Sequence, residues 1–324
     1  MVLVPDLEPF IRSHQGAMGS LFGIIAPVFA LIGAGALALR LRMISPEAIR
    51  GMTDLVFYAA MPCLLFRSIA AAPPLRLLDV AGTFLAGAYI IFFLALFLAR
   101  RLLRVRLAQA SVFGINAVFG NTVMLGIPVI DAAFGPEGVA NLLAVIAFHS
   151  ALLLPLATIL IEADTGYGRG IWAVMRATLP GVVRNPVVVT IVAALAWRAT
   201  GWELADAVNR LLLLAGAAGP PLALFCLGAS LPKPKGLEDL REVLLASLLK
   251  LVVMPLLIAG LAWMAGVRGV AFAVVVMAAA LPTGANAFLL ARRFGTMMEA
   301  SASTVVVSTA VSLFTLTVLL GWLR

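Results

Sequence analysis

The sequence predicts an all-α membrane protein with ten transmembrane helices. Of its 324 residues, 63% are hydrophobic and 12% are charged, and the mean hydropathy is +1.11. Soluble domains are only about 45–50% apolar. Windows of roughly 19 residues separate ten apolar segments, each near the length that crosses the hydrocarbon core of a bilayer. Most charged residues lie between these segments, which is the third observation that favours a membrane protein.

The predicted spans follow one another with short connections. They cover residues 20–39, 53–71, 80–99, 111–134, 139–161, 185–201, 209–231, 243–265, 269–291 and 302–323. The sixth is the weakest, because its uncharged core from Pro186 to Trp197 is short and lies between Arg184 and Arg198. This pattern is typical of a multi-pass protein of a cell membrane.

Lysine and arginine residues are concentrated in alternate connections. Cytoplasmic loops carry an excess of these residues, so the richer side is predicted to be cytoplasmic and both termini to lie outside. The net charge of +8 therefore reflects membrane topology, and we expect no nucleic-acid partner. The richer side holds fifteen of these residues, Arg40, Arg42, Arg50, Arg100, Arg101, Arg104, Arg106, Arg169, Arg176, Arg184, Lys233, Lys235, Arg241, Arg292 and Arg293, and the other side five, Arg12, Arg76, Arg198, Arg268 and Arg324.

Residues 1–19 are predicted to form an N-terminal arm outside the membrane. Asp6 and Glu8 precede the first arginine there, which is the reverse of the charge order in a secretory signal. Cys63 and Cys226 both fall within predicted spans. The sequence therefore indicates neither a disulfide scaffold nor a zinc site, and we expect no metal or other cofactor.

The chain is predicted to contain an internal duplication. Pro27 and Pro186 each open an apolar run, and each is followed 35 residues later by a proline of a P-x-x-L-F motif, Pro62 and Pro221. Prolines are frequent in membrane helices, so a chance match is the alternative interpretation. The duplication predicts two five-helix repeats of opposite orientation, residues 20–161 and 185–324, joined by a cytoplasmic connector at 162–184.

The fourth and ninth spans each carry poor helix formers at their centre. Their sequences are FGNTVMLGIPV at 119–129 and AALPTGANAFLLA at 279–291. Proline removes a backbone donor and clashes with the preceding turn, so we expect both helices to open, at Pro128 and at Pro282. The alternative is that the glycines only permit close helix packing while the prolines kink the helices.

Two interrupted helices at corresponding positions of inverted repeats predict the binding site of a secondary transporter. Free N–H groups at the starts of half-helices attract an anion, and freed carbonyl groups attract a cation or a proton donor. The predicted substrate-binding residues are Asn121, Thr122, Pro128, Lys250, Pro282, Thr283 and Asn286.

Two titratable residues within the predicted spans are further candidates. His149 lies near the centre of the fifth span and is a candidate carrier of a coupling proton, with a neutral structural role as the alternative. Lys250 in the eighth span would either pair with a substrate carboxylate or extend toward the cytoplasm. Asp54 is expected to cap the helix of the second span or to pair with a loop arginine. No catalytic motif is present, so the sequence does not indicate an enzyme.

Five motifs together resemble the auxin efflux carrier family in its short prokaryotic form. They are GNTVMLGIP followed by FGPEG, then RNP at the sixth span, PLALFCLGASL in the seventh and LPTGANAFLLARRFG in the ninth. The resemblance runs from about residue 24 to the C-terminus. It implies a fold like that of sodium/proton antiporters and bile acid transporters, in which the fourth and ninth helices are broken and cross.

The resemblance also implies two structural parts with different roles and a class of substrate. Spans 1, 2, 6 and 7 would form a scaffold and the contact of a homodimer, and spans 3–5 and 8–10 a moving transport domain. Substrates in the family are mostly small organic anions, such as mono- and dicarboxylates. The co-ion is left open between H⁺ and Na⁺. The alternatives are a sodium-coupled symporter of the bile acid type, a channel and a membrane sensor.

Overall fold

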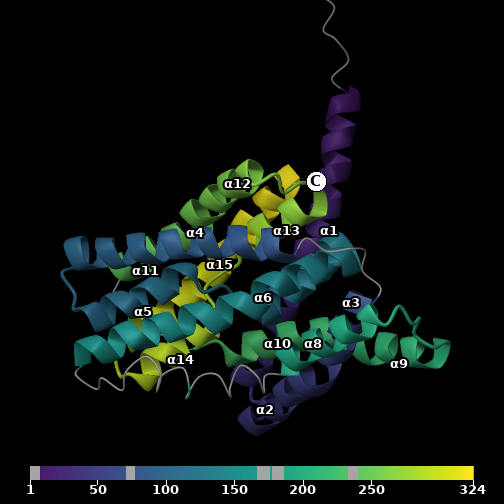
Figure 1. The fold of residues 1–324 in the computed structure, drawn as a ribbon, viewed down its shortest axis with the longest axis horizontal. Coiled ribbons are helices and arrows are strands. Elements are labelled where there is room, and N and C mark those ends of the chain that lie inside the picture. Colours follow the sequence, from purple (N-terminus) through teal and green to yellow (C-terminus); the bar gives the residue numbers. More distant parts are fainter. Residues whose placement is uncertain (1–7, 71–76, 166–175, 177–185, 233–239, 324) are drawn as a thin grey trace, which may run out of the picture.

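The computed structural model describes residues 8–70, 77–165, 176, 186–232 and 240–323. All the secondary-structure elements in these ranges are helices. The described residues contain one β-type backbone pairing, an isolated bridge between Gly120 and Thr283. Figure 1 shows long helices running side by side, with helices from the two halves of the chain intermixed. The all-helical class predicted from the sequence is therefore confirmed.

The helices of the first half begin with α1 at Glu8. They are α1 (Glu8–Arg40), α2 (Pro46–Leu55), α3 (Met61–Ala70), α4 (Leu77–Leu98), α5 (Leu107–Val118) and α6 (Ile127–Thr165), with π-helical turns η1 (Val56–Ala60), η2 (Ala99–Leu103) and η3 (Thr122–Gly126). Gly135 has a left-handed φ of 61° inside α6. The helix therefore changes direction there, at the predicted junction between the fourth and fifth spans.

The helices of the second half begin with α8 at Pro186. They are α8 (Pro186–Ala199), α9 (Asp206–Ala217), α10 (Gly219–Ser230), α11 (Leu240–Leu248), α12 (Met254–Met264), α13 (Gly269–Ala280), α14 (Ala285–Arg293) and α15 (Met298–Leu323), with the π-helical turn η4 (Leu249–Val253). Two long helical segments form where these elements join end to end. One is Asp206–Ser230, from α9 and α10, and the other is Leu240–Met264, from α11, η4 and α12.

Six helical segments in the described part of the chain are long and apolar enough to cross a membrane. They are Pro46–Ala70, Asp79–Leu103, Thr122–Ile146, Asp206–Ser230, Leu240–Met264 and Met298–Leu323. Four shorter apolar helices accompany them, at Ile25–Arg40, Leu107–Val118, Pro186–Ala199 and Gly269–Ala280. The chain is thus a multi-pass membrane protein, and the number of ten spans stays a prediction.

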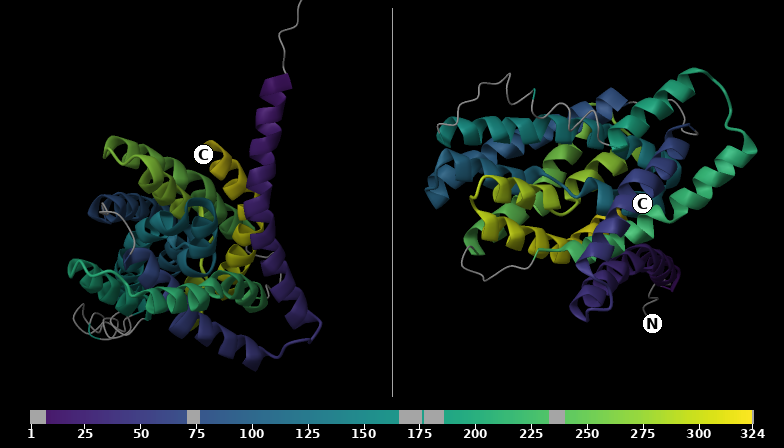
Figure 2. Two further views of the ribbon diagram at one scale, coloured as in Figure 1. Left: turned by 90° about the vertical axis from the view of Figure 1, so that its right-hand side faces the viewer. Right: turned by 90° about the horizontal axis from the view of Figure 1, so that it is seen from below.

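The helices pack in two groups. In one group α1 lies against α10, and α3 lies against both α8 and α9. In the other group α4, α5 and α6 pack on one another and α12 packs on α13, while α15 lies against α11 and α14. Figure 2 shows α1 and α2 at one side of the molecule, away from α4 and α5.

The first group contains a very close contact between helix backbones. A Cβ atom added at Gly35 would overlap the carbonyl oxygen of Phe225, and one added at Gly228 would overlap the carbonyl oxygen of Ile32. Only glycine fits at such a crossing, and the close approach increases the van der Waals contact between α1 and α10.

The predicted arm and connector fall partly outside the described residues. Residues 8–19 of the arm form the first turns of α1, and these turns project beyond the other helices (Figures 1 and 2). Residues 162–165 of the connector belong to the end of α6, and Arg176 is described alone. The rest of both predicted segments lies outside the described residues.

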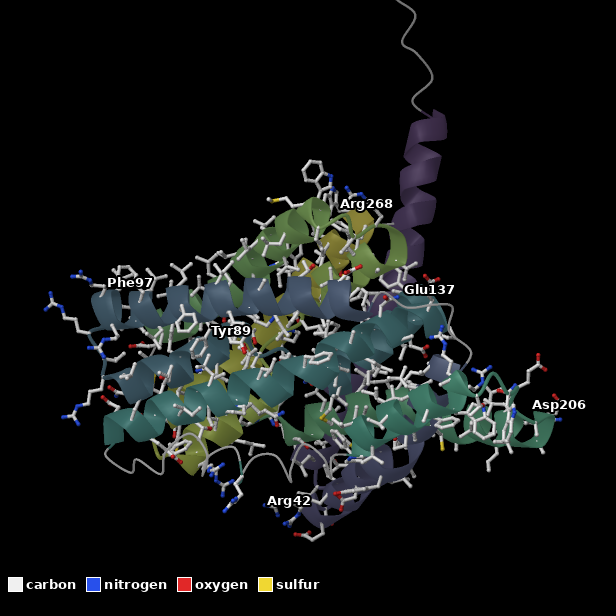
Figure 3. All side chains as sticks on the ribbon, in the orientation of Figure 1. Arg42, Tyr89, Phe97, Glu137, Asp206 and Arg268 are labelled. Carbon is white, nitrogen blue, oxygen red and sulfur yellow. The ribbon has the colours of Figure 1, made fainter. Side chains whose placement is uncertain are left out.

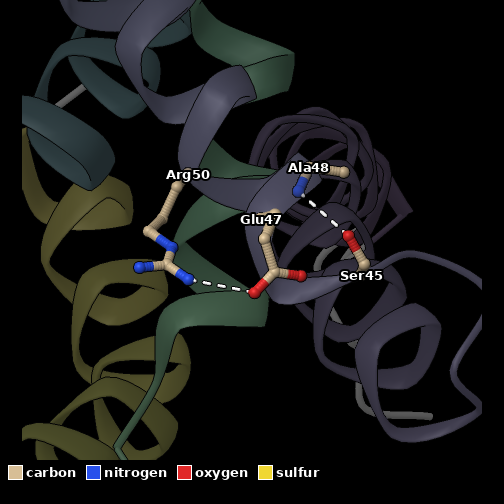
Figure 4. Close-up of polar contacts among 4 residues, drawn as sticks. All are labelled: Ser45, Glu47, Ala48 and Arg50. Carbon is tan, nitrogen blue, oxygen red and sulfur yellow. Dashed lines mark hydrogen bonds and ion pairs between the residues drawn. The ribbon is translucent and has the colours of Figure 1, made fainter.

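The prediction that Asp54 caps the helix of the second span was wrong, because α2 begins earlier than the apolar pattern suggests. Ser45 is the N-cap and accepts a hydrogen bond from the Ala48 amide at 3.2 Å, as Figure 4 shows. Glu47 in the first turn pairs with Arg50 at 3.0 Å. A serine cap, a proline at the first helical position and an acidic first turn are strong start signals, and they place Asp54 in the last turn.

Charged side chains lie at the edges of the molecule. In Figure 3 the labelled residues Arg42, Glu137, Asp206 and Arg268 lie at its periphery, whereas Tyr89 lies among the helices. The long sides of the bundle expose large apolar side chains such as Phe93, Leu256 and Phe314. An apolar girdle between charged ends is the surface that a bilayer requires.

Candidate functional site

Two interrupted helical segments cross inside the protein. The first stops at Val118 and resumes at Thr122, and the second stops at Ala280 and resumes at Ala285. The amide of Asn121 donates to the carbonyl of Pro282, and the amide of Gly284 donates to the carbonyl of Phe119, both at 2.8 Å. These two bonds form the isolated bridge. Each stretch thus satisfies backbone groups of the other, which would otherwise cost several kcal/mol each within a membrane.

The prediction that the fourth span opens at Pro128 was wrong. The chain leaves the helix at Phe119, Gly120 and Asn121, and Pro128 is the second residue of α6. The π-helical turn η3 lies just before it, and the Ile127 amide bonds to the Thr122 carbonyl, five residues back. This wider turn changes the spacing in front of the proline ring, so the helix continues past Pro128.

Other prolines of the chain show the same arrangement. The turn η1 ends two residues before Pro62 and η4 ends two residues before Pro255, as η3 does before Pro128. In each case the residue directly before the proline donates to a carbonyl five positions back. Pro282 differs, because it lies within an extended stretch, and there the helix opens as predicted.

The crossing leaves less room for a side chain at Gly284 than at Gly120. A Cβ atom at Gly284 would lie 3.1 Å from the Gly120 carbonyl oxygen and 3.3 Å from the Asn121 nitrogen. A Cβ atom at Gly120 would find its nearest neighbours at 3.5 Å, an ordinary contact. The close approach of the two backbones therefore depends mainly on Gly284.

Four helix ends meet at the crossing. The C-terminal ends of α5 and α13 bring carbonyl groups with partial negative charge, and the N-terminal ends of η3 and α14 bring amide groups with partial positive charge. The negative ends are bonded by side chains, since the Asn116 carbonyl accepts from Thr283 Oγ1 at 2.7 Å and the Ala279 carbonyl accepts from Lys250 Nζ. The positive ends are the part of the crossing suited to an anion.

The predicted polar residues take different places around the crossing. Asn121, Thr122 and Thr283 are buried within it, with 8%, 3% and 0% of their surfaces exposed. The Thr283 amide donates to Ser308 Oγ at 3.0 Å, so the backbone amide and the hydroxyl of Thr283 are both bonded within the protein. Asn286 lies in the first turn of α14 and is exposed. The structure thus brings three of these side chains together and leaves Asn286 on the outside.

A buried polar cluster behind the crossing was missed in the sequence. Asn116 of α5 is 1% exposed, and its Nδ2 donates to Ser301 Oγ at 2.8 Å, while its Oδ1 has no hydrogen-bond partner among the described residues. Ser301 lies on α15, whose buried hydroxyl residues are Ser301, Ser303, Thr304, Ser308, Thr309 and Ser312. Hydroxyl residues recur there at three- and four-residue spacing, which is the periodicity of one helix face and was the available signal.

Lys250 does not extend toward the cytoplasm, so that alternative was wrong. The side chain is 0% exposed, and Nζ contacts the Ala279 carbonyl and, at 3.6 Å, the sulfur of Met254. Its Cε would lie 3.5 Å from a Cβ atom placed on Gly120. Lys250 therefore lies against the crossing, on the side where α13 ends.

His149 lies against the same stretch, at Phe119. It is fully buried, and its ring centre is 4.2 Å from that of Phe119, with the ring of Phe84 edge-on at 5.9 Å. Phe119 and Gly120 are neighbours in the chain, so the two titratable residues named from the sequence both contact the first break. Their roles in binding or coupling stay predictions.

The sequence is similar to known proteins over most of its length. A family model described as "Membrane transport protein" matches residues 20–320. A protein of Rhizobium meliloti (strain 1021) named "Putative malonate transporter" is 25% identical over 317 residues, 95% of this chain and 97% of the relative. An "Uncharacterized transporter" of Methanothermobacter thermautotrophicus is 26% identical over 318 residues, covering 92% of this chain and 97% of its own length.

Proposed function

Because this chain belongs to the membrane transport protein family, the family of the auxin efflux carriers, we propose that it is a secondary transporter of small organic anions. It would move a mono- or dicarboxylate across the cell membrane by alternating access. The observation that carries this proposal is the crossing of two broken helical segments, which are held by backbone bonds at 2.8 Å. The chain is a transporter by family, and not an enzyme.

The substrate carboxylate would bind at the positive helix ends of the crossing. Asn121 directly precedes η3, Thr122 is its first residue, and Asn286, which is exposed, is the second residue of α14. Side-chain amides and hydroxyls donate hydrogen bonds to a carboxylate, and the helix ends add partial positive charge. Thr283 and Pro282 shape the second stretch, because their polar groups are bonded within the protein. Pro128 contributes only through the shape of α6.

A dicarboxylate is the substrate class that we favour. The Rhizobium meliloti relative carries malonate in its printed name. The crossing has two positive helix ends, η3 and α14, on two different segments. Each end suits one carboxylate of a short diacid, whereas a monocarboxylate would use one end alone.

The movement would occur between a scaffold and a transport domain. We assign the group of α1, α2, α3, α8, α9 and α10 to the scaffold and the group of α4–α6 and α11–α15 to the transport domain. The support is that each group packs mainly within itself and that η3 packs against α10, which places the first break beside the scaffold. Ten spans in two inverted repeats, outward termini and a homodimer formed through the scaffold belong to the same proposal.

Proton coupling through His149 is our proposal for the co-ion. The imidazole ring stacks on Phe119, whose carbonyl oxygen accepts the Gly284 amide of the crossing. A change of charge on that ring would therefore act directly beside the bonds that hold the two segments together.

Binding and uptake measurements test the proposal. We expect malonate and other short dicarboxylates to raise the unfolding temperature of the purified protein, and the protein in liposomes to take up radiolabelled malonate with saturation. Short amino acids with no net charge serve as the control ligands. Stabilisation by the control ligands alone, or uptake that rises linearly with concentration, would contradict the proposed function.

A further inference from the structure

The ammonium group of Lys250 lies at a place where two negative helix ends converge. Nζ donates to the Ala279 carbonyl in the last turn of α13, and Cε runs beside Gly120, two residues after α5 ends. The side chain belongs to η4, a different span, and none of its surface is exposed. A third span therefore supplies a side-chain nitrogen to the crossing.

The two negative helix ends of the crossing favour a cation beside them. Each C-terminal helix end carries the equivalent of about −0.5 elementary charge, so the ends of α5 and α13 together carry about −1. A lysine ammonium carries one positive charge and three donors. The described residues contain no cluster of three or more histidine, cysteine, aspartate or glutamate side chains that could hold a metal.

We infer that Lys250 is a built-in cation that neutralises the crossing of the two broken segments, in the place that a bound metal cation would otherwise take. Lys250 is then a positioning residue, which acts on the substrate by holding the pocket together. Anion binding would need no Na⁺, since the positive charge is covalently attached. The inference replaces the expectation that Lys250 pairs directly with a substrate carboxylate.

Direct pairing with substrate fits the geometry less well. The Lys250 nitrogen already contacts Ala279 and Met254 and lies at the carbonyl side of the crossing. The amide side, where an anion is favoured, is formed by η3 and α14. The contacts of Nζ with described residues are thus with a carbonyl and a thioether, and not with a carboxylate.

Three substitutions at this residue separate its charge from its hydrogen bond and its volume. Lys250→Arg keeps the charge, Lys250→Gln keeps a donor without the charge, and Lys250→Met keeps only the approximate length. Arg241→Met removes a positive charge from an exposed position in the same helical segment, Leu240–Met264, and serves as the matched control. Hydrogen exchange of the Asn121 and Gly284 amides, which form the bridge, reports on the crossing without any ligand.

We expect the bridge amides to exchange at least about tenfold faster in Lys250→Gln and Lys250→Met than in the wild type, and to be restored in Lys250→Arg. Exchange in Arg241→Met should equal that of the wild type. Wild-type rates in Lys250→Gln would overturn the inference, because hydrogen bonding alone would then suffice. Failure of Lys250→Arg to restore the rates would also overturn it, because shape and not charge would then decide.

The sodium arm of the experiment rests on the proposed function. Malonate affinity of the wild type is measured in Na⁺ and in N-methyl-D-glucamine, and we expect the two values to agree within about twofold. A tenfold loss without Na⁺ would overturn the built-in cation. Absence of binding in both buffers would contradict the proposed function instead, and the exchange measurement would still decide the role of Lys250.

Discussion

The two breaks at the crossing are built from different residues. In the first, Gly120 and Asn121 leave the helix, and the proline of that span lies in the following helix, behind a π-helical turn. In the second, Pro282 lies within the break, next to Thr283 and Gly284. Both produce the same result, an extended stretch whose amide and carbonyl groups bond to the other stretch. The comparison teaches that the partner stretch, more than the proline, keeps each helix open.

The largest effect is expected from a methyl group at the tighter of the two glycines. Gly284→Ala places a Cβ atom 3.1 Å from the Gly120 carbonyl oxygen and 3.3 Å from the Asn121 nitrogen, so the two stretches must move apart by a few tenths of an ångström and the bridge is weakened. We predict a loss of about 1–3 kcal/mol in the free energy of unfolding and loss of most transport. The matched variant Gly120→Ala meets only ordinary contacts and should keep both.

Thermal unfolding and liposome uptake of the two variants check this prediction. Equal behaviour of Gly284→Ala and Gly120→Ala would show that the bridge distances do not govern the site. A larger defect in Gly120→Ala would reverse the comparison between the two breaks.

The second prediction concerns the asparagine of the first break. Asn121→Ala removes a side-chain donor at the start of η3, and hydrogen bonds to charged groups contribute about 1.5–3 kcal/mol. We expect malonate affinity, measured by calorimetry, to fall by about 10- to 100-fold with little change in stability. Asn141→Ala is the control, because the Asn141 side-chain amide donates to the Glu137 carbonyl of its own helix. Wild-type affinity in Asn121→Ala would remove this residue from the site.

The third prediction compares the two prolines directly. Pro282→Ala restores a backbone donor within the second break and should lower the malonate affinity about three- to tenfold, since the stretch gains access to helical conformations. Pro128→Ala lies in a helix already and should change the affinity less than twofold. Titration of both variants with malonate measures the difference. A larger loss in Pro128→Ala would support the original placement of the opening.

The smallest effect is expected in the pH dependence of transport. His149→Gln removes the titratable ring that stacks on Phe119, and imidazole is the side chain that commonly changes charge between about pH 5 and 8. We predict that the uptake rate of the variant varies less over that range than the wild-type rate does. An identical pH profile in wild type and variant would exclude His149 as the proton carrier.

Sequence patterns located the second break better than the first for a physical reason. L-P-T-G at 281–284 combines a residue that has no backbone donor with a glycine, so it is a strong signal, and Pro282 lies within the break itself. Glycine and asparagine only weaken a helix, and whether they open it depends on a partner stretch 160 residues away in the chain. The π-helical turn before Pro128 depends on packing that no local pattern encodes.

The site residues show the same division between local and tertiary information. Asn121, Thr122 and Thr283 could be named because polar residues in an apolar span are few and conspicuous. The direction of the Lys250 side chain could not be predicted, because it depends on which face of η4 packs against α5 and α13. Asn116 was missed because its importance comes from Ser301 on α15, a contact between the two halves of the chain.

A cryo-EM map of the protein with malonate bound tests the central claim most directly. The account predicts density for a carboxylate within hydrogen-bonding distance of Asn121 and of the first amides of η3 and α14, with the Gly120–Thr283 bridge intact. Malonate bound elsewhere, or two helices running unbroken past residues 119–121 and 281–284, would contradict it.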